Sequence, residues 1–135
     1  MSQRPHRKLI VWQKAMDFVE TVYHVTGRFP HEEQFGLVAQ LRRAAVSVAS
    51  NIAEGAARQT MKETLQALYI ARGSISELDT QLEIAHRLRF LSEAQWIELL
   101  GPLDDMSRLL QGLISSKKRP SISQSLNHSI TQSLR

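Results

Sequence analysis

The sequence predicts an all-α protein, an antiparallel up-down-up-down four-helix bundle. Apolar residues recur at helical spacing in four successive segments, and no segment shows the alternation of a half-buried strand. The links between these segments are only a few residues long, so neighbouring helices must run in opposite directions. The 135 residues are enough for one domain with a single core.

The first helix is expected to begin near Leu9 and to end at Gly27 and Pro30, two residue types that terminate helices. Its main apolar column consists of Val11, Ala15, Phe18, Val22, Val25 and Phe29. A second column beside it consists of Trp12, Met16, Val19 and Tyr23. Two adjacent columns make an apolar face wider than one partner helix normally covers.

The second helix is expected to start at Glu32 and Glu33, which suit a helix N-terminus, and to end near Ala57. Its main column consists of Leu37, Leu41, Ala44, Val48 and Ile52, and its second column of Phe35, Ala39, Val46, Ala49 and Ala53. This helix should therefore be the most buried. Because the first two helices present more apolar surface than one core can cover, we expect the chain to form a homo-oligomer.

The third and fourth helices each begin with the spacing of a capping box, at Thr60 and Glu63 and at Ser92 and Gln95. The column of the third helix consists of Leu68, Ala71, Ile75, Leu78, Leu82 and Ala85. The column of the fourth consists of Trp96, Leu99, Leu103, Met106, Leu110 and Leu113.

The chain is predicted to comprise a basic N-terminal arm (1–8), the bundle (9–116) and a C-terminal tail (117–135). The tail is rich in serine, and its hexapeptide SISQSL at 121–126 returns as SITQSL at 129–134. Such low-complexity sequence is predicted to be disordered.

Positive charge is concentrated at the two chain ends. The sequence has 17 Lys and Arg against 13 Asp and Glu, but the arm and the tail hold basic residues without any acidic ones. An up-down bundle brings the start of the first helix, the bend between the second and third, and the end of the fourth to one pole. That pole collects the candidate nucleic-acid-binding residues Arg4, Arg7, Lys8, Arg58, Lys62, Lys117, Lys118 and Arg119, against only Glu54 and Glu63. A basic pole suits phosphate contacts, which carry little sequence preference, although solubilising ends have the same composition.

The stretch LRRAAVSVASNIAEG, at 41–55, threads polar residues through small apolar ones. Arg42 lies in the second apolar column of its helix, so it needs an acceptor, and Glu77 on the third helix offers one. Gly73 would allow close approach of that helix. We therefore predict a structural polar network of Arg42, Arg43, Asn51, Glu54, Arg72, Ser74 and Glu77, which fixes helix register rather than performing a reaction.

No catalytic residue, cofactor or metal site is predicted. The chain has no Gly-rich phosphate loop, nucleophile elbow or HExxH motif, and it has no cysteine for a thiolate site. Glu83 and His86 form one ExxH turn, but di-iron bundles need two such turns and two further glutamates, and Glu20 and His24 have the wrong spacing. Without a signal-peptide or membrane-span pattern, a cytoplasmic location without membrane contact is expected.

Four segments together resemble the four-helix-bundle family encoded in intervening sequences of bacterial 23S rRNA genes. They are VWQKAMDFV, FP followed by EE and FG, QLRRAAVSVASNIAEG, and ARGSISEL. The resemblance covers about 9–116, and NIAEG (51–55) and ARGS (71–74) are its specific motifs. The same family includes the accessory variability determinant of diversity-generating retroelements, which is a pentameric basic barrel that partners a reverse transcriptase and binds nucleic acid.

The resemblance implies a bacterial, non-enzymatic homopentamer that contacts RNA or DNA. Unlike the basic accessory protein, this chain has a neutral to acidic helical body, which leaves the basic pole as the expected contact. The alternative is a protein-interaction scaffold or an accessory subunit of a polymerase, such as a reverse transcriptase, without nucleic-acid specificity of its own.

Overall fold

The structure, a computed structural model, describes residues 4–119, and in this range it contains helices and turns without any strand. In chain order the elements are η1 (Pro5–Lys8), α1 (Ile10–Thr26), η2 (His31–Glu33), α2 (Leu37–Ala57), α3 (Met61–Arg87) and α4 (Glu93–Lys118), where η denotes a short 3₁₀ helix. The predicted all-α, four-helix class is confirmed.

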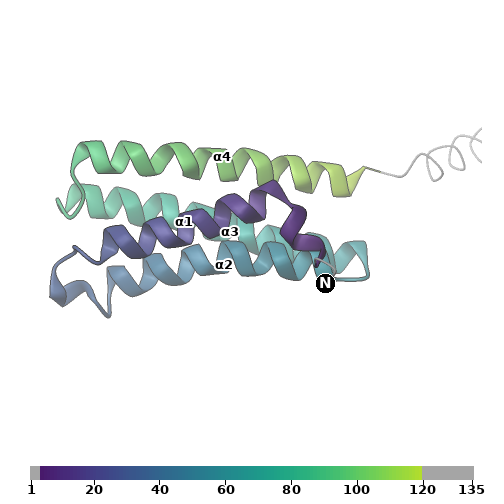
Figure 1. Ribbon diagram of the computed structural model, residues 1–135, viewed down its shortest axis with the longest axis horizontal. Coiled ribbons are helices and arrows are strands. Elements are labelled where there is room, and N and C mark those ends of the chain that lie inside the picture. Colours follow the sequence, from purple (N-terminus) through teal and green to yellow (C-terminus); the bar gives the residue numbers. More distant parts are fainter. Residues whose placement is uncertain (1–3, 120–135) are drawn as a thin grey trace, which may run out of the picture.

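The four α-helices lie side by side, and Figure 1 shows the chain direction reversing from each helix to the next. Each helix contacts its neighbour in the chain, and α1 also contacts α4, so the four close into a bundle. This arrangement matches the predicted up-down-up-down order. The links α1–α2 and α3–α4 lie at one end, and the N-terminus, the α2–α3 bend and the end of α4 lie at the other.

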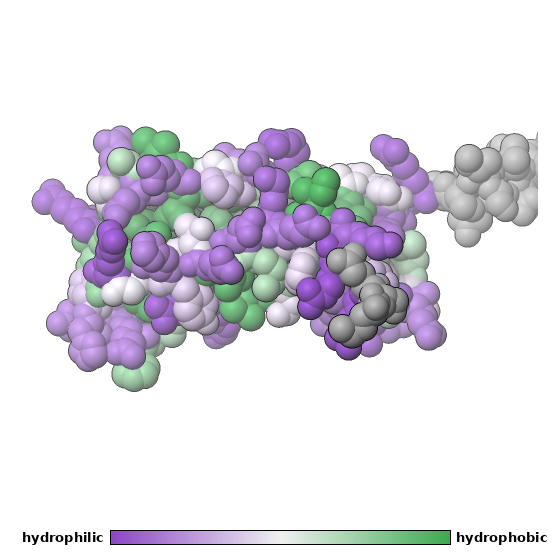
Figure 2. Space-filling model, in the orientation of Figure 1, coloured by the Kyte–Doolittle hydropathy of each residue, from purple (hydrophilic) through white to green (hydrophobic). Residues whose placement is uncertain are grey.

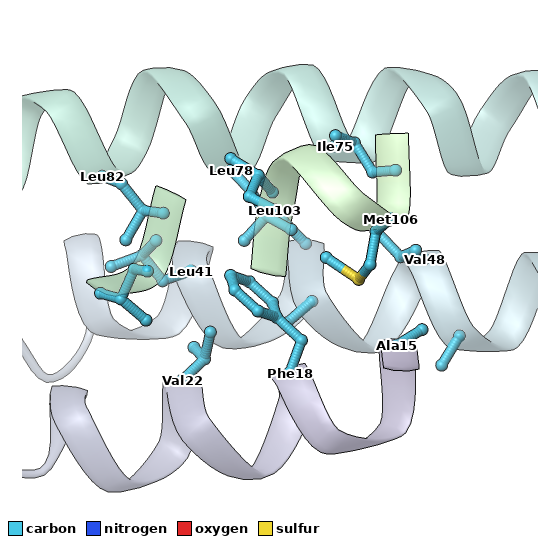
Figure 3. Close-up of a cluster of buried hydrophobic side chains, with 14 of the residues drawn as sticks. Ala15, Phe18, Val22, Leu41, Val48, Ile75, Leu78, Leu82, Leu103 and Met106 are labelled. Carbon is cyan, nitrogen blue, oxygen red and sulfur yellow. The ribbon is translucent and has the colours of Figure 1, made fainter. Parts of the chain in front are cut away.

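The core is a continuous apolar cluster to which all four α-helices contribute (Figure 3). Its central members include Phe18, Val22, Leu41, Val48, Leu78, Leu82, Leu103 and Met106, all of which belong to the predicted columns. As predicted, α2 has the largest share of buried positions among the α-helices.

Both predicted N-terminal caps are present, but only one is a complete capping box. At α4 the Ser92 hydroxyl accepts the Gln95 amide, and the Gln95 side chain accepts the Ser92 amide. At α3 the Thr60 hydroxyl accepts the Glu63 amide but donates its own proton to the Glu63 carboxylate, at 2.8 Å. That carboxylate therefore does not close the second bond of the box.

The predicted start of the second helix was wrong. Glu32 and Glu33 form η2, and α2 begins only at Leu37, because the backbone of Gly36 (φ −106°, ψ −110°) is not helical. Glu33 still serves the helix start, since its carboxylate accepts the Leu37 amide at 3.3 Å. Because α2 begins only at Leu37, Phe35 lies outside the helix and is 91% exposed, although the sequence placed it in an apolar column.

The structure adds detail at the two chain ends. Within the N-terminal arm Pro5–Lys8 form η1, which contacts both α1 and α2. At the other end α4 continues through Lys117 and Lys118, two residues assigned to the tail. The repeat SISQSL and SITQSL lies outside the described residues.

Candidate nucleic-acid interface

Three parts of the chain meet at one end of the bundle: η1, the α2–α3 bend and the last turn of α4. A cavity of about 130 Å³ is lined by residues of η1, of the two helices that flank the bend and of α4, among them Pro5, Gly55, Thr64 and Lys117. The elements that carry the eight candidate basic residues therefore come together at one pole, as the sequence predicted.

The N-terminal segment is held against α1 by the indole of Trp12. The His6 ring meets this indole edge-on at 4.9 Å between centroids, and the Arg7 guanidinium lies 5.5 Å from the ring centroid. The Gln13 side-chain amide also donates to the carbonyl of Arg7 at 2.8 Å. These contacts give the basic residues of η1 a fixed place at the pole.

Arg58 differs from the other basic residues at this pole because it is ion-paired. Its guanidinium contacts the Glu54 carboxylate one turn earlier, and a second nitrogen lies 3.9 Å from Glu63. The hydrogen bond and charge of Glu54 raise the pKa of Arg58 above its ordinary value. Arg58 is therefore compensated by two acids and is a weak candidate for phosphate contact.

The remaining basic residues define the cationic cap: Arg4, Arg7, Lys8, Lys62, Lys117, Lys118 and Arg119. All seven side chains are exposed, and within residues 4–119 none of them forms an ion pair. The only acids that the sequence assigned to this pole, Glu54 and Glu63, face Arg58 instead.

Arg42 finds its acceptors on α1, so its predicted pairing with Glu77 was wrong. Its Nε donates to the Thr26 hydroxyl at 3.0 Å, and its Nη2 donates to the Tyr23 carbonyl at 3.3 Å. The guanidinium also lies 4.4 Å from the centroid of the Tyr23 ring. The helix dipole of α1 stabilises the Arg42 guanidinium at the last turn of that helix. Arg42 would lose this stabilisation if it paired with Glu77 on α3.

Part of the predicted polar contact between α2 and α3 does exist. The Ser74 hydroxyl donates to the Ser47 hydroxyl at 2.8 Å. The side-chain amide of Asn51 donates to the same hydroxyl at 3.1 Å and to the Ser47 carbonyl at 2.9 Å. These three residues form a small cluster between the two helices. Ser47, which connects them, was not among the predicted members.

The other predicted members do not join this cluster, so the single network was wrong. Arg43 and Glu77 are exposed and make no side-chain hydrogen bond within the described chain. Arg72 turns to α4, where it donates to the Gln111 side chain at 3.4 Å. Exposed charged groups gain more from water than from a shared buried network, which explains their separation.

The glycine that allows close approach of α2 and α3 is Gly55 rather than Gly73. A Cβ atom at Gly55 would lie 3.2 Å from the Thr64 carbonyl oxygen and 3.3 Å from Leu68 Cδ2, whereas one at Gly73 would meet no atom within 4 Å. The carbonyl of Gly55 also accepts the buried hydroxyl of Thr64 at 3.0 Å. The last glycine of NIAEG is therefore a packing residue.

The sequence of the chain identifies the family to which it belongs. Residues 7–112 match the 23S rRNA-intervening sequence protein family. The chain belongs to that family. The resemblance noted from the sequence motifs is thus confirmed.

A solved structure shares the fold of this family member. It is a crystal structure of a protein with unknown function from the S23 ribosomal protein family of Bacteroides thetaiotaomicron. The two chains are 21% identical, the alignment covers 78% of this chain and 96% of that one, and the TM-score is 0.74. At this identity the likeness concerns the fold alone. No curated protein matches the chain.

The ExxH turn of this family member is used in packing. The rings of His86 and Trp96 stack in parallel, 4.2 Å apart, and His86 Nδ1 lies 3.9 Å from the Glu83 carboxylate. Within residues 4–119 no group of three or more His, Cys, Asp or Glu residues could hold a metal ion. Over the same range no helix is both long and apolar enough to cross a membrane.

One residue of this region was not predicted from the sequence, the tyrosine beside the cationic cap. The Tyr69 ring lies 4.8 Å from the Arg72 guanidinium and 6.0 Å from the Lys118 ammonium, measured to its centroid. Tyr69 and Lys62 share a face of α3 because they are seven residues apart, a spacing that could have been read from the sequence. The approach of Lys118 from α4 could not be predicted from the sequence, because it depends on how α3 and α4 pack against each other.

Proposed function

We propose that this family member is a non-enzymatic, oligomeric bundle whose cationic cap contacts the phosphate backbone of RNA or DNA. The observation that carries the proposal is the cap itself: seven exposed cations from three separate elements, none of them ion-paired within residues 4–119. A nucleic acid would release counterions on binding such a surface, which makes the affinity depend steeply on salt.

The apolar outer face of the first two helices supports self-association. Met16 and Tyr23 are 41% and 45% exposed on α1, and Val46, one turn from Arg42 on α2, is 40% exposed. Figure 2 shows hydrophobic patches between the hydrophilic side chains of the face in view. In a cyclic homo-oligomer such as a pentamer, the caps of all subunits would face the same side and form one concentrated basic surface.

The test compares two triple variants that remove the same charge from different places. One replaces the cap residues Arg4, Lys8 and Lys62 with glutamine. The matched control replaces three exposed arginines outside the cap, Arg28, Arg43 and Arg89, with glutamine. Arg7 is left in place because it packs on Trp12.

We expect the cap variant to bind RNA more weakly and with a flatter salt dependence. If all three side chains neutralise phosphates, the slope of log affinity against log salt should fall by roughly 2–3. The control should keep the slope of the unmodified protein, which fluorescence anisotropy over a salt series measures. Equal slopes in both variants would refute phosphate contact at the cap.

A protein-interaction scaffold is the second candidate, and Phe35 favours it. This side chain is 91% exposed in the α1–α2 link, at the end opposite the cap. Exposed aromatic residues are common anchors of protein contacts. A scaffold of this kind, for example an accessory subunit of a polymerase, would retain its partner when the cap is neutralised.

A further inference from the structure

An open groove continues from the cationic cap along the outer face of α3. It is lined by Lys62, Leu65, Gln66, Tyr69 and Ile70. These residues lie three or four positions apart, so they form one strip along about two turns of helix. Lys62 belongs to both the cap and the groove, which makes the two surfaces continuous.

The Tyr69 ring is one of the residues that line this groove, and it is also approached by Lys118 from α4. The Arg72 guanidinium lies 4.8 Å from the ring centroid and the Lys118 ammonium 6.0 Å from it. Positive groups therefore lie in the groove at Lys62 and beside its tyrosine, and none of its lining residues is acidic. The apolar residues between them include Ile70, which is 50% exposed.

We infer that this groove binds an unpaired segment of single-stranded RNA or DNA, an assignment that rests on the proposed function of the cap. The Arg72 guanidinium lies over the Tyr69 ring, and this pair, together with the neighbouring apolar side chains, offers a flat surface on which a base can stack. Lys62 and Lys118 supply cations for the flanking phosphates. A base inside a duplex cannot use such a surface, because its faces are already stacked. The groove therefore distinguishes single strands from duplexes, which the cap alone does not.

A second copy of this chain is the competing occupant, since exposed apolar residues also serve subunit contacts. The charge of the groove favours the nucleic acid. Two cations lie over an aromatic ring here, a third lines the groove, and none of the lining residues is acidic, a composition that matches a polyanion carrying flat apolar bases.

The experiment uses the full chain with a fluorescent uridine oligonucleotide and an RNA duplex of the same length. Tyr69→Leu removes the ring and keeps apolar bulk, and Tyr69→Phe is the matched control that keeps the ring. We expect Tyr69→Leu to weaken single-strand binding by roughly 5- to 100-fold and to leave duplex binding unchanged. Tyr69→Phe should bind both probes like the unmodified protein.

A second measurement is independent of folding in the variants. The unmodified protein should bind an abasic oligonucleotide, which keeps the phosphates and lacks the bases, with a loss similar to that caused by Tyr69→Leu. Equal binding of the normal and abasic strands would overturn the inference.

The outcomes separate this inference from the proposed function. If neither probe binds in a salt-dependent way, the cap proposal itself fails. If both probes bind with a normal salt slope and Tyr69→Leu changes neither affinity, the cap stands and the groove assignment fails. If Tyr69→Leu instead changes the sedimentation coefficient, the groove is a contact between copies, which also overturns the inference.

Discussion

Arg89 lies two residues after the end of α3, in the left-handed region of backbone space, with a φ of 65°. Around it the Arg89 amide donates to the His86 carbonyl at 3.0 Å, and the Phe90 amide donates to the Ala85 carbonyl at 2.9 Å. These two bonds form a Schellman motif, in which the left-handed position is usually glycine. An arginine there carries a steric cost that its Cβ atom imposes.

Replacing Arg89 with glycine should therefore stabilise the protein. The left-handed conformation costs an L-residue roughly 1–2 kcal/mol, and the greater freedom of glycine in the unfolded chain offsets roughly 0.4–1 kcal/mol of that gain. We expect the free energy of unfolding to rise by up to about 1 kcal/mol, measured by chemical denaturation. Arg89→Ala is the control, since it removes the charge but keeps the strain. Equal stability of the glycine and alanine variants would show that the conformation is not strained.

Arg42 shows what a residue pattern can and cannot predict. Its position in an apolar column of α2 implied partial burial and a need for acceptors, and the structure confirms both. The pattern could not say which neighbouring helix provides them. The actual acceptors include a backbone carbonyl, that of Tyr23, and backbone groups are invisible to a search for complementary side chains.

At the scale of the elements, the contact between α2 and α3 depends on small residues. Gly55 lets the Thr64 carbonyl and the Leu68 side chain approach closely, and Thr64 returns a hydrogen bond to the Gly55 carbonyl. Farther along the same pair of helices, the Ser74 hydroxyl donates a hydrogen bond to the Ser47 hydroxyl at 2.8 Å. Short side chains thus allow close contact at both places, and each polar atom keeps a partner.

Gly55→Ala and Gly73→Ala form a matched pair, since both replace a glycine inside a helix. Alanine at Gly73 meets open space, so we expect it to stabilise the protein by roughly 0.5–1 kcal/mol through helix propensity alone. At Gly55 the added methyl would press on the Thr64 backbone, and overpacking costs roughly 1–3 kcal/mol. The net effect there should be a loss of about 1 kcal/mol. Thermal denaturation of both variants tests this; an equal gain at the two sites would contradict close packing at Gly55.

Helix boundaries that depend on local chemistry were predictable, and those that depend on the chain outside the helix were not. The Ser92 cap and the α2 end at Ala57 follow from nearby residues, and both are observed. The start of α2 was misplaced because Gly36 interrupts an apolar pattern that continues across it. The exposure of Phe35 follows from that interruption. The spacing of apolar residues does not reveal a break in backbone conformation, so this exposure was not predicted.

At the scale of the whole molecule, the position of the cationic cap was predictable because it follows from helix count and short links. Any four rods that alternate in direction bring the first turn, the middle bend and the last turn to one pole. The sequence could not predict which of these basic residues form ion pairs. The pairing of Arg58 with Glu54 and Glu63 depends on the geometry of the α2–α3 bend. The groove at Tyr69 escaped prediction for a similar reason, since Lys118 reaches it from another helix.

The amount of apolar surface was anticipated, but its distribution was not. The expected excess on α1 is present at Met16 and Tyr23, while α2 exposes little beyond Val46. The outer face of α3 also exposes apolar residues, among them Ile70 and Ile84. A ring of subunits needs two different surfaces on each copy, and the α1 face and the part of α3 around Ile84, outside the groove that ends at Ile70, provide two candidates.

Met16→Glu tests whether the α1 face joins subunits. The side chain is 41% exposed in the single chain, so a carboxylate there should leave the fold of one subunit intact. If the face is buried between copies, the same carboxylate must lose its water without gaining a partner, and association should weaken strongly. Thr21→Glu is the control, because it adds the same charge at an exposed position on another side of α1. Sedimentation velocity should show the Met16 variant shifted towards the single chain and the Thr21 variant assembled like the unmodified protein. Assembly that is unaffected by Met16→Glu would exclude this face, and the concentration of several caps into one basic surface would then have to rest on a different interface.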